Sequence, residues 1–125
     1  MALITGEYSG FLASFRGLNM NSTRDQALLI NSSRYAIRRI VVNNASANLT
    51  LAAGGIYTAS SKGGTAIVPA AQVYVALSAA AKFLDLTLAA ILGTDVRTET
   101  TLFFSLTTAQ GGAATADLFI FGDPL

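Results

Sequence analysis

The sequence predicts an all-β domain, a β-sandwich or jelly roll of about eight short strands with at most one short helix. Short apolar runs recur along the chain at intervals of roughly 8 to 15 residues, separated by Gly, Asn, Ser and Thr turn signals. The runs are rich in β-branched and aromatic residues, most clearly at residues 35–44. No long stretch has the period of an amphipathic helix. Many short strands without helices between them are typical of sandwiches and jelly rolls.

The length of 125 residues suits one domain. We expect residues 21–125 to form a single β-sandwich domain and residues 1–20 to form an N-terminal arm or the first strand. The segment has no clean period, and a short helical turn is a further option. As an arm, it would dock on a neighbouring subunit with Phe11 and Phe15 as its anchors.

The first clear strand is expected at residues 25–30, an apolar run between two turn signals. These signals are Asn-Ser-Thr at 21–23 and Asn-Ser-Ser at 31–33. The next strand, at residues 35–44, is apolar for most of its length, so we expect it to be buried.

Two adjacent arginines, Arg38 and Arg39, interrupt that second strand, and its alternation changes phase there. They indicate a β-bulge or an exposed edge. The favoured interpretation is a solvated strand face, and the alternative is a salt bridge between subunits to a carboxylate such as Asp85 or Asp117. The pattern assigns Tyr35, Ile37 and Val41 to one face, and Arg38, Ile40 and Val42 to the other.

A β-hairpin is expected after a turn that covers residues 43–48. Its strands, at 56–59 and 65–68, flank the loop Ser-Ser-Lys-Gly-Gly at 60–64. Pro69 ends the second strand or places it at a sheet edge. Residues 49–53 before the hairpin are a short strand or a turn.

The middle of the chain leaves two alternatives open. Residues 73–77 have strand composition, but the alanines favour a helix through 70–81. Residues 83–90 alternate strictly, with Leu at 84, 86 and 88 and Ala at 90 on one side, which predicts a half-buried strand. After a turn at 93–95 and a polar loop, residues 100–107 alternate again, with Leu102, Phe104 and Leu106 directed inward.

The last predicted strand, at residues 116–122, is apolar on both faces. Leu118 and Ile120 lie on one side, and Phe119 and Phe121 on the other. A strand of this kind is central in its sheet or lies against a partner.

The composition points to contacts with other folded chains. Only 12% of the residues are charged and 52% are apolar, whereas ordinary soluble domains have about 25% charged residues. An Ala-rich chain would also raise the apolar fraction, but an apolar surface patch on a small domain usually marks an interface. The candidate interface residues are Phe11, Phe15, Arg38, Arg39, Phe119 and Phe121.

The sequence offers no catalytic, cofactor-binding or metal-binding residues, and we expect no enzyme. It has no His and no Cys, which excludes His-based triads, thiol nucleophiles and the usual zinc sites. The net charge of +1 and the scattered basic residues predict no nucleic-acid partner. We also expect no signal peptide, because residues 1–7 have no basic region and no long apolar run. No membrane partner is expected either, because Lys82 and Asp85 interrupt the one long apolar stretch, residues 66–92.

Four phrases of the sequence carry a family resemblance. They are Ile-Arg-Arg-Ile-Val-Val-Asn-Asn-Ala-Ser at 37–46, Ala-Gly-Gly-Ile-Tyr-Thr-Ala at 53–59, Lys-Gly-Gly-Thr-Ala-Ile-Val at 62–68 and Ser-Leu-Thr-Thr-Ala-Gln-Gly at 105–111. Together they resemble small β-rich virion proteins encoded in tailed phages and prophages. The resemblance covers about residues 20–125 and carries no catalytic signature.

This resemblance implies a capsid decoration (cement) protein of the bacteriophage virion with a β-sandwich fold. Such a structural protein forms a homotrimer, binds adjacent major capsid subunits and lies on the capsid surface after synthesis in the host cytoplasm. A head-fibre, tail or baseplate protein on the same fold is an alternative. A carbohydrate-binding module is an alternative of another class, although the chain has no Trp and only four Tyr for stacking on sugars.

Overall fold

The chain folds into two antiparallel sheets. The computed structural model describes residues 10–78, 82–89 and 95–125. These residues contain eight β-strands and no helix, which confirms the predicted all-β sandwich, and they contain no helix able to cross a membrane. The strands are β1 (Gly10–Asn19), β2 (Gln26–Leu29), β3 (Tyr35–Asn43), β4 (Ala53–Ala59), β5 (Gly63–Val68), β6 (Phe83–Asp85), β7 (Thr101–Thr108) and β8 (Thr115–Pro124).

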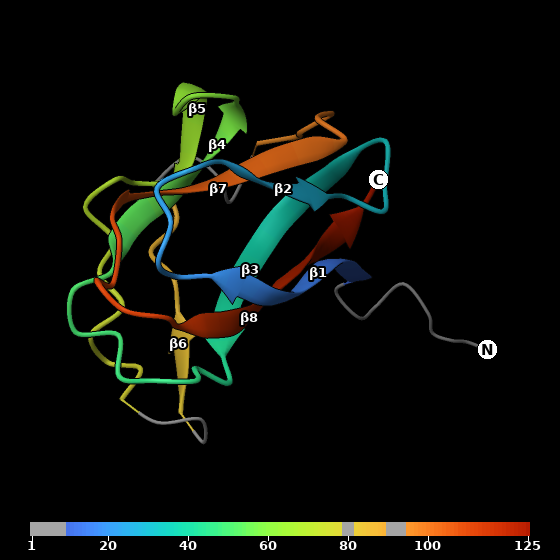
Figure 1. Cartoon of the computed structure of the whole chain (residues 1–125). Helices are drawn as coiled ribbons and strands as arrows, with labels where there is room; N and C mark the ends of the chain where they lie inside the picture. Colours follow the sequence, from blue (N-terminus) through green and yellow to red (C-terminus); the bar gives the residue numbers. More distant parts are fainter. Residues whose placement is uncertain (1–9, 79–81, 90–94) are drawn as a thin grey trace.

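The strand order is that of an eight-stranded jelly roll. One sheet has the order β1-β8-β3-β6 and the other the order β2-β7-β4-β5 (Figure 1). The antiparallel pairs are nested, so that β1 pairs with β8, β2 with β7, β3 with β6 and β4 with β5. The chain is therefore paired like one long hairpin that is rolled into two layers. The final strand β8 is central in its sheet, between β1 and β3, as its two apolar faces predicted.

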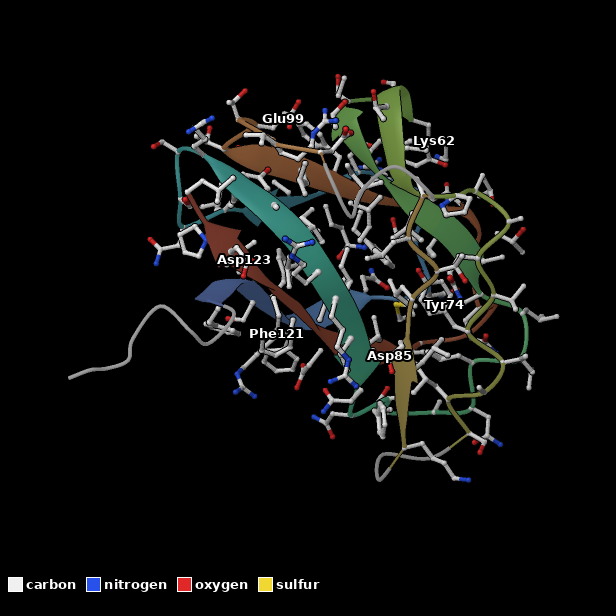
Figure 2. The ribbon with its side chains drawn as sticks, turned by 180° about the vertical axis from the view of Figure 1, so that it is seen from behind. Lys62, Tyr74, Asp85, Glu99, Phe121 and Asp123 are labelled. Carbon is white, nitrogen blue, oxygen red and sulfur yellow. The ribbon has the colours of Figure 1, made fainter. Side chains whose placement is uncertain are left out.

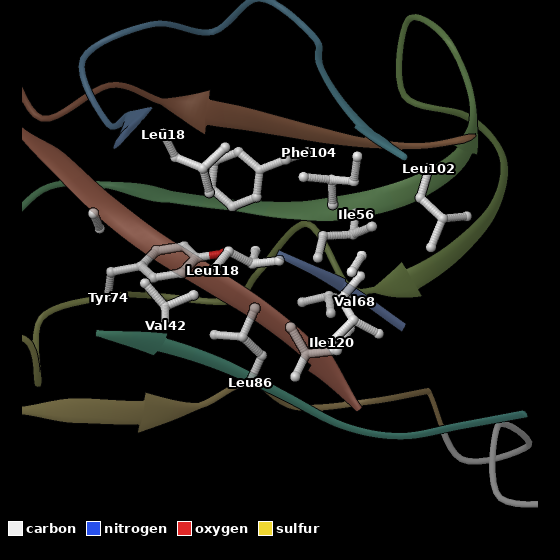
Figure 3. Packing of buried hydrophobic residues seen from close by; sticks show 14 of the residues in the cluster. Leu18, Val42, Ile56, Val68, Tyr74, Leu86, Leu102, Phe104, Leu118 and Ile120 are labelled. Carbon is white, nitrogen blue, oxygen red and sulfur yellow. The ribbon is translucent and has the colours of Figure 1, made fainter. Parts of the chain in front are cut away.

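The core fills the space between the two sheets. Leu102, Phe104 and Leu106 of β7 are fully buried, which confirms the inward face predicted for this strand. Figure 3 shows Phe104 and Ile56 of one sheet facing Leu118 and Ile120 of the other. Since β8 alternates, the inward side chains of Leu118 and Ile120 leave Phe119 and Phe121 on the outer face of the sheet.

The predicted first segment is a strand where it is described. Residues 10–19 form β1, which pairs with β8 at the edge of its sheet. Residues 1–9 lie outside the described part of the chain.

A β-bulge at Arg38 sets the two faces of β3. Ile37 pairs with Gly122 and Arg39 with Phe121, so Arg38 is an extra residue on its strand. The predicted bulge is confirmed, but the faces assigned from the sequence were wrong. The extra residue shifts the alternation, so that Ile37, Ile40 and Val42 all face the core while Val41 faces outward with Arg39.

The predicted hairpin is present as β4 and β5. Ser61 and Lys62 adopt positive φ angles of 57° each, which the tight loop requires. The loop is held from outside, because the Asp25 carboxylate accepts a hydrogen bond from the Ser61 N–H at 2.8 Å. Pro69 directly follows β5, which is an edge strand as predicted.

Residues 70–78 form neither the predicted strand nor the competing helix. They are turns with one isolated bridge, between Val73 and Ala53. The Gln72 side chain adds to the backbone bonds of this bridge, since it donates to the Val73 carbonyl oxygen at 2.8 Å and accepts from the Thr87 N–H at 2.7 Å. The segment is anchored by Tyr74 and Leu77, both fully buried. Residues 79–81 lie outside the described part.

The predicted strand at residues 83–90 is shorter than expected. Only β6 pairs with β3, and the chain then crosses between the layers: Leu86 N–H donates to the Ile40 carbonyl oxygen and Ala89 N–H to that of Ile67, on the other sheet. The alternation holds as far as Leu88, because Leu84, Leu86 and Leu88 pack against the core, but Ala89, predicted on the opposite face, packs there as well. Ala90 and residues 93 and 94 of the predicted turn lie outside the described part.

An ion-pair cluster fixes the chain ahead of β7. The Arg97 guanidinium binds the Glu99 carboxylate at 2.8 Å and the Asp95 carboxylate at 3.2 Å. Arg97 also forms a two-way backbone bridge with Tyr35, whose hydroxyl donates to the Glu99 carbonyl oxygen at 2.7 Å. Burial raises the pKa of Tyr35 to about 12. The cluster therefore ties the start of β3 to the chain ahead of β7.

This cluster predicts an acid-dependent contribution to stability. The hydrogen bond with Arg97 lowers the pKa of Glu99 from 4.5, so the contribution is present above pH 4.5 and is lost as the pH falls through the lowered value. Replacing Glu99 with Gln should reduce the free energy of unfolding by about 0.5–1 kcal/mol at pH 7. Urea titrations between pH 7 and pH 3 should show this difference narrowing in acid. A difference that is constant with pH would contradict the assignment.

Candidate functional site

The outer face of the sheet β1-β8-β3-β6 carries an apolar surface. We call it the aromatic face and define it by Phe11, Val41, Phe83, Phe119 and Phe121. Phe11 is 53% exposed and Phe83 is 59% exposed, while Phe119 and Phe121 are half-buried. Strand alternation produces this surface, because the neighbouring residues of β8 and β3 face the core.

Pairing between strands brings these side chains together. Phe11 on β1 lies opposite Phe121 on β8, and Phe119 on β8 lies opposite Val41 on β3. The ring centroid of Phe11 is 5.6 Å from that of Phe121 and 6.1 Å from that of Phe119, with tilted planes. Aromatic pairs at such distances stabilise one another. The three rings therefore form a fixed cluster on the surface.

Two arginines border the aromatic rings. The Arg16 guanidinium lies 5.5 Å from the centroid of Phe119, and that of Arg39 lies 5.8 Å from the centroid of Phe83. Arg39 also forms a two-pronged ion pair with Asp85 on β6, one contact of which is 3.1 Å. This hydrogen bonding lowers the pKa of Asp85. Figure 2 shows Phe121 on β8 and Asp85 on β6, the two strands that flank β3 in the sheet.

The face contains a shallow hollow of about 390 Å³, which is the size range of small binding sites. Its walls are mainly hydrocarbon, and its polar groups are few. Asn43 contributes a side-chain oxygen that is buried and has no hydrogen-bond partner among the described residues. The residues around the hollow are Arg39, Val41, Asn43, Phe83, Phe119 and Phe121.

A buried carboxylate organises one end of the face. Asp117 on β8 is 7% exposed and accepts hydrogen bonds from the Gly17 N–H at 2.9 Å and the Asn44 side-chain amide at 3.1 Å. Gly17 adopts a positive φ of 76° at the second bulge of β1. Arg16, the preceding residue, pairs with the same carboxylate at 3.6 Å. Asp117 therefore holds Arg16 beside the aromatic face.

The structure brings together four of the six predicted interface residues. Phe11, Arg39, Phe119 and Phe121 meet on the aromatic face. Phe15 instead packs against the core cluster, because the bulge between Phe11 and Ala13 turns it inward.

The predicted arginines find their carboxylate partners in the same chain. Arg38 pairs with Asp123 at 2.7 Å, and Arg39 pairs with Asp85. Asp85 was named from the sequence as a partner in another subunit, and here it occupies that role within one chain. Both arginines are exposed, as the solvated strand face predicted.

Sequence reasoning missed Phe83 and Arg16. The strict alternation at residues 83–90 placed Phe83 on the polar side together with Asp85, and an aromatic residue on the polar side of a half-buried strand is a detectable signal. Arg16 carries no comparable signal, since its position depends on the bulge in β1 and on Asp117.

The described carboxylates are all engaged in structural contacts. Five of them pair with an arginine and Asp25 accepts from a backbone N–H. Within the described ranges, no three acidic side chains converge on a point where a metal ion could bind. The three described tyrosines, Tyr35, Tyr57 and Tyr74, are buried and so offer no ring to a ligand. The arrangement is suited to binding by apolar contact.

The chain was compared with known proteins at three levels. Searches against protein-family models, curated proteins and solved structures give no significant match.

Proposed function

We propose that this chain is a structural protein of a phage virion, a capsid decoration protein that self-assembles as a homotrimer and binds adjacent major capsid subunits. It acts by association with folded chains and carries out no chemistry. The observation that carries the proposal is the aromatic face, a cluster of exposed rings on one sheet of a jelly roll.

The composition of the face favours a protein partner. Aromatic residues and arginine are enriched in the energetically important centre of protein interfaces, whereas other charged residues are depleted there. Burial of apolar surface contributes about 25 cal/mol per Å², so covering Phe11 and Phe83 alone is a substantial gain. Both rings are more than half exposed in the single chain.

The fold and the sequence add to this proposal. Jelly rolls are common among viral capsid domains but also among lectins, so the fold alone does not choose a function. The four phrases that resemble tailed-phage proteins favour the virion. The carbohydrate-binding alternative has less in its favour, because the described tyrosines are buried and the chain has no Trp.

Removal of the exposed Phe83 ring should weaken assembly while leaving the stability of the fold nearly unchanged. Phe83 is 59% exposed on a three-residue edge strand, so replacing it with Ser should change the free energy of unfolding by less than about 1 kcal/mol. We expect the same change to weaken assembly and retention on capsids roughly tenfold or more. Light scattering gives the native mass, which should be three times the chain mass of 12.9 kDa for the unaltered protein.

The matched control is Leu29→Ser, which removes an exposed apolar side chain, 72% exposed against 59% for Phe83, from the other sheet. Particles from cells that encode the chain are compared with particles that lack it, by thermal melting and by immunogold labelling. Labelling of the head surface agrees with decoration, and labelling of a fibre, tail or baseplate favours the alternative. A protein that is monomeric and leaves the melting temperature of undecorated heads unchanged would contradict the proposal.

A further inference from the structure

The described residues leave the aromatic face uncovered, and residues 1–9 directly precede its first strand, β1, in the sequence. Residues 1–9, Met-Ala-Leu-Ile-Thr-Gly-Glu-Tyr-Ser, precede Gly10 directly, and Phe11 is the first aromatic residue of the face. We propose that residues 1–9 of a second copy bind the aromatic face, with Glu7 beside Arg16 and apolar side chains over the hollow. This inference rests on the proposed function, because it assigns the aromatic face to self-assembly.

Charge complementarity favours this segment. Glu7 is its one charged side chain, and the face carries two arginines. Arg39 is already bound to Asp85 through two of its nitrogens. The Arg16 side chain is 74% exposed and makes one ion contact with a described residue, at 3.6 Å. A guanidinium has five N–H donors, so Arg16 retains the capacity to bind another carboxylate.

The apolar composition of the segment suits the hollow. Five of its nine residues are apolar, namely Met1, Ala2, Leu3, Ile4 and Tyr8. In an extended chain every second side chain projects to the same side, so Met1 and Leu3 would contact the face together with Glu7, while Ala2, Ile4 and Tyr8 would project to the other side. The acidic residue would then lie at the arginine border while the apolar end covers the rings.

The direction of β1 favours a second copy over the same chain. Gly10 pairs with Gly122, and β1 then runs past Phe121 and Phe119, which flank the hollow. A segment that precedes Gly10 therefore has to reverse direction to lie on its own hollow. Nine extended residues span about 30 Å, close to the diameter of a domain of this size, which is about 30–35 Å. An extended segment of nine residues would therefore be long enough to reach a neighbouring copy.

Each copy in this arrangement gives one segment and receives one. Such a head-to-tail contact closes into a ring when the rotation between copies permits it. A ring of three copies agrees with the proposed homotrimer, and each copy would then bury the aromatic face of the next.

Charge reversal in the full chain tests the inference without truncation. Glu7→Arg and Arg16→Glu should each weaken self-association about tenfold or more, because each places like charges together. The two variants mixed in equal amounts should recover association in part, since a mixed ring of three restores two of its three contacts. Arg24→Glu, an equal charge change in the exposed β1–β2 turn, is the control and should behave as the unaltered chain. Light scattering and sedimentation measure each sample.

The mixture distinguishes exchange between copies from docking within one chain. If the segment docked on the face of its own chain, the double variant E7R/R16E would recover self-association but the mixture of single variants would not. The inference would then be wrong. Single variants that associate like the unaltered chain would also overturn it, as would an unaltered chain that is monomeric. The mixture could recover self-association while the unaltered protein does not bind particles. That result would support the exchange of segments between copies and refute the capsid role, so failure of one proposal can be told apart from failure of the other.

Discussion

Replacing Tyr74 with Ala is expected to lower the free energy of unfolding by about 3–5 kcal/mol, the range measured for large buried side chains. Tyr74 is fully buried, and its ring meets Phe104 edge to face with the centroids 6.1 Å apart. Its hydroxyl donates to the Gly54 carbonyl oxygen at 3.1 Å. The residue thus links the irregular segment 70–78 to both the core and β4. Urea denaturation with fluorescence or circular dichroism measures the change.

The matched variant is Tyr74→Phe, which keeps the ring and removes the hydroxyl. We expect it to cost about 1–2 kcal/mol, because the Gly54 carbonyl then loses a buried partner. A cost below about 1 kcal/mol for the alanine variant would show that Tyr74 is not packed as described, since a buried ring of this size cannot be removed so cheaply.

Replacing Gly55 with Ala is expected to destabilise the fold by at least about 3 kcal/mol, and the variant should be recovered poorly in soluble form. A Cβ at this position would lie 2.0 Å from the Val68 carbonyl oxygen and 2.9 Å from backbone atoms of Pro69. Both contacts are with backbone, so no side chain can rotate away. The pairing of β4 with β5 therefore has to shift. Thermal unfolding and solubility measure the effect.

Gly112→Ala serves as the comparison for this glycine. A Cβ at Gly112 would meet no heavy atom within 4 Å, so we expect a change within about 0.5 kcal/mol. If the two alanine variants were equally stable, β4 and β5 would not approach as closely as the structure has them.

The elements that the sequence predicted well are those with local signals. Strand β7 alternates with a period of two, and the β4–β5 hairpin has its turn residues in the loop itself. These signals act over a few residues and need no knowledge of the partner strand. The two apolar faces of β8 likewise predicted a central strand.

The failures arose where distant contacts decide. Residues 70–78 have the alanine content of a helix, but Gln72 and Tyr74 bind groups 15 and 20 residues away. The faces of β3 were misassigned because the position of a bulge depends on the register with β8. Local propensity cannot report such contacts, since tertiary packing overrides it.

The aromatic face was predictable in part for the same reason. Phe119 and Phe121 follow from the alternation of β8, and Phe83 could have been found from the polar side of its strand. Phe11 and Phe15 looked equivalent in the sequence, and only the bulge in β1 separates them. The hollow depends on three strands, β3, β6 and β8, lying side by side, which no single stretch encodes.

The nested order of the strands has a consequence for synthesis. β1 emerges from the ribosome before the other described strands, yet its hydrogen-bonding partner is β8, the last of them in the sequence. A nascent chain therefore cannot complete this layer until β8 has been translated. Folding dominated by such distant pairings is slow and leaves apolar strands open to aggregation meanwhile. With so few charged side chains to keep it dispersed, the newborn polypeptide is expected to depend on chaperones or on lowered temperature for high yield.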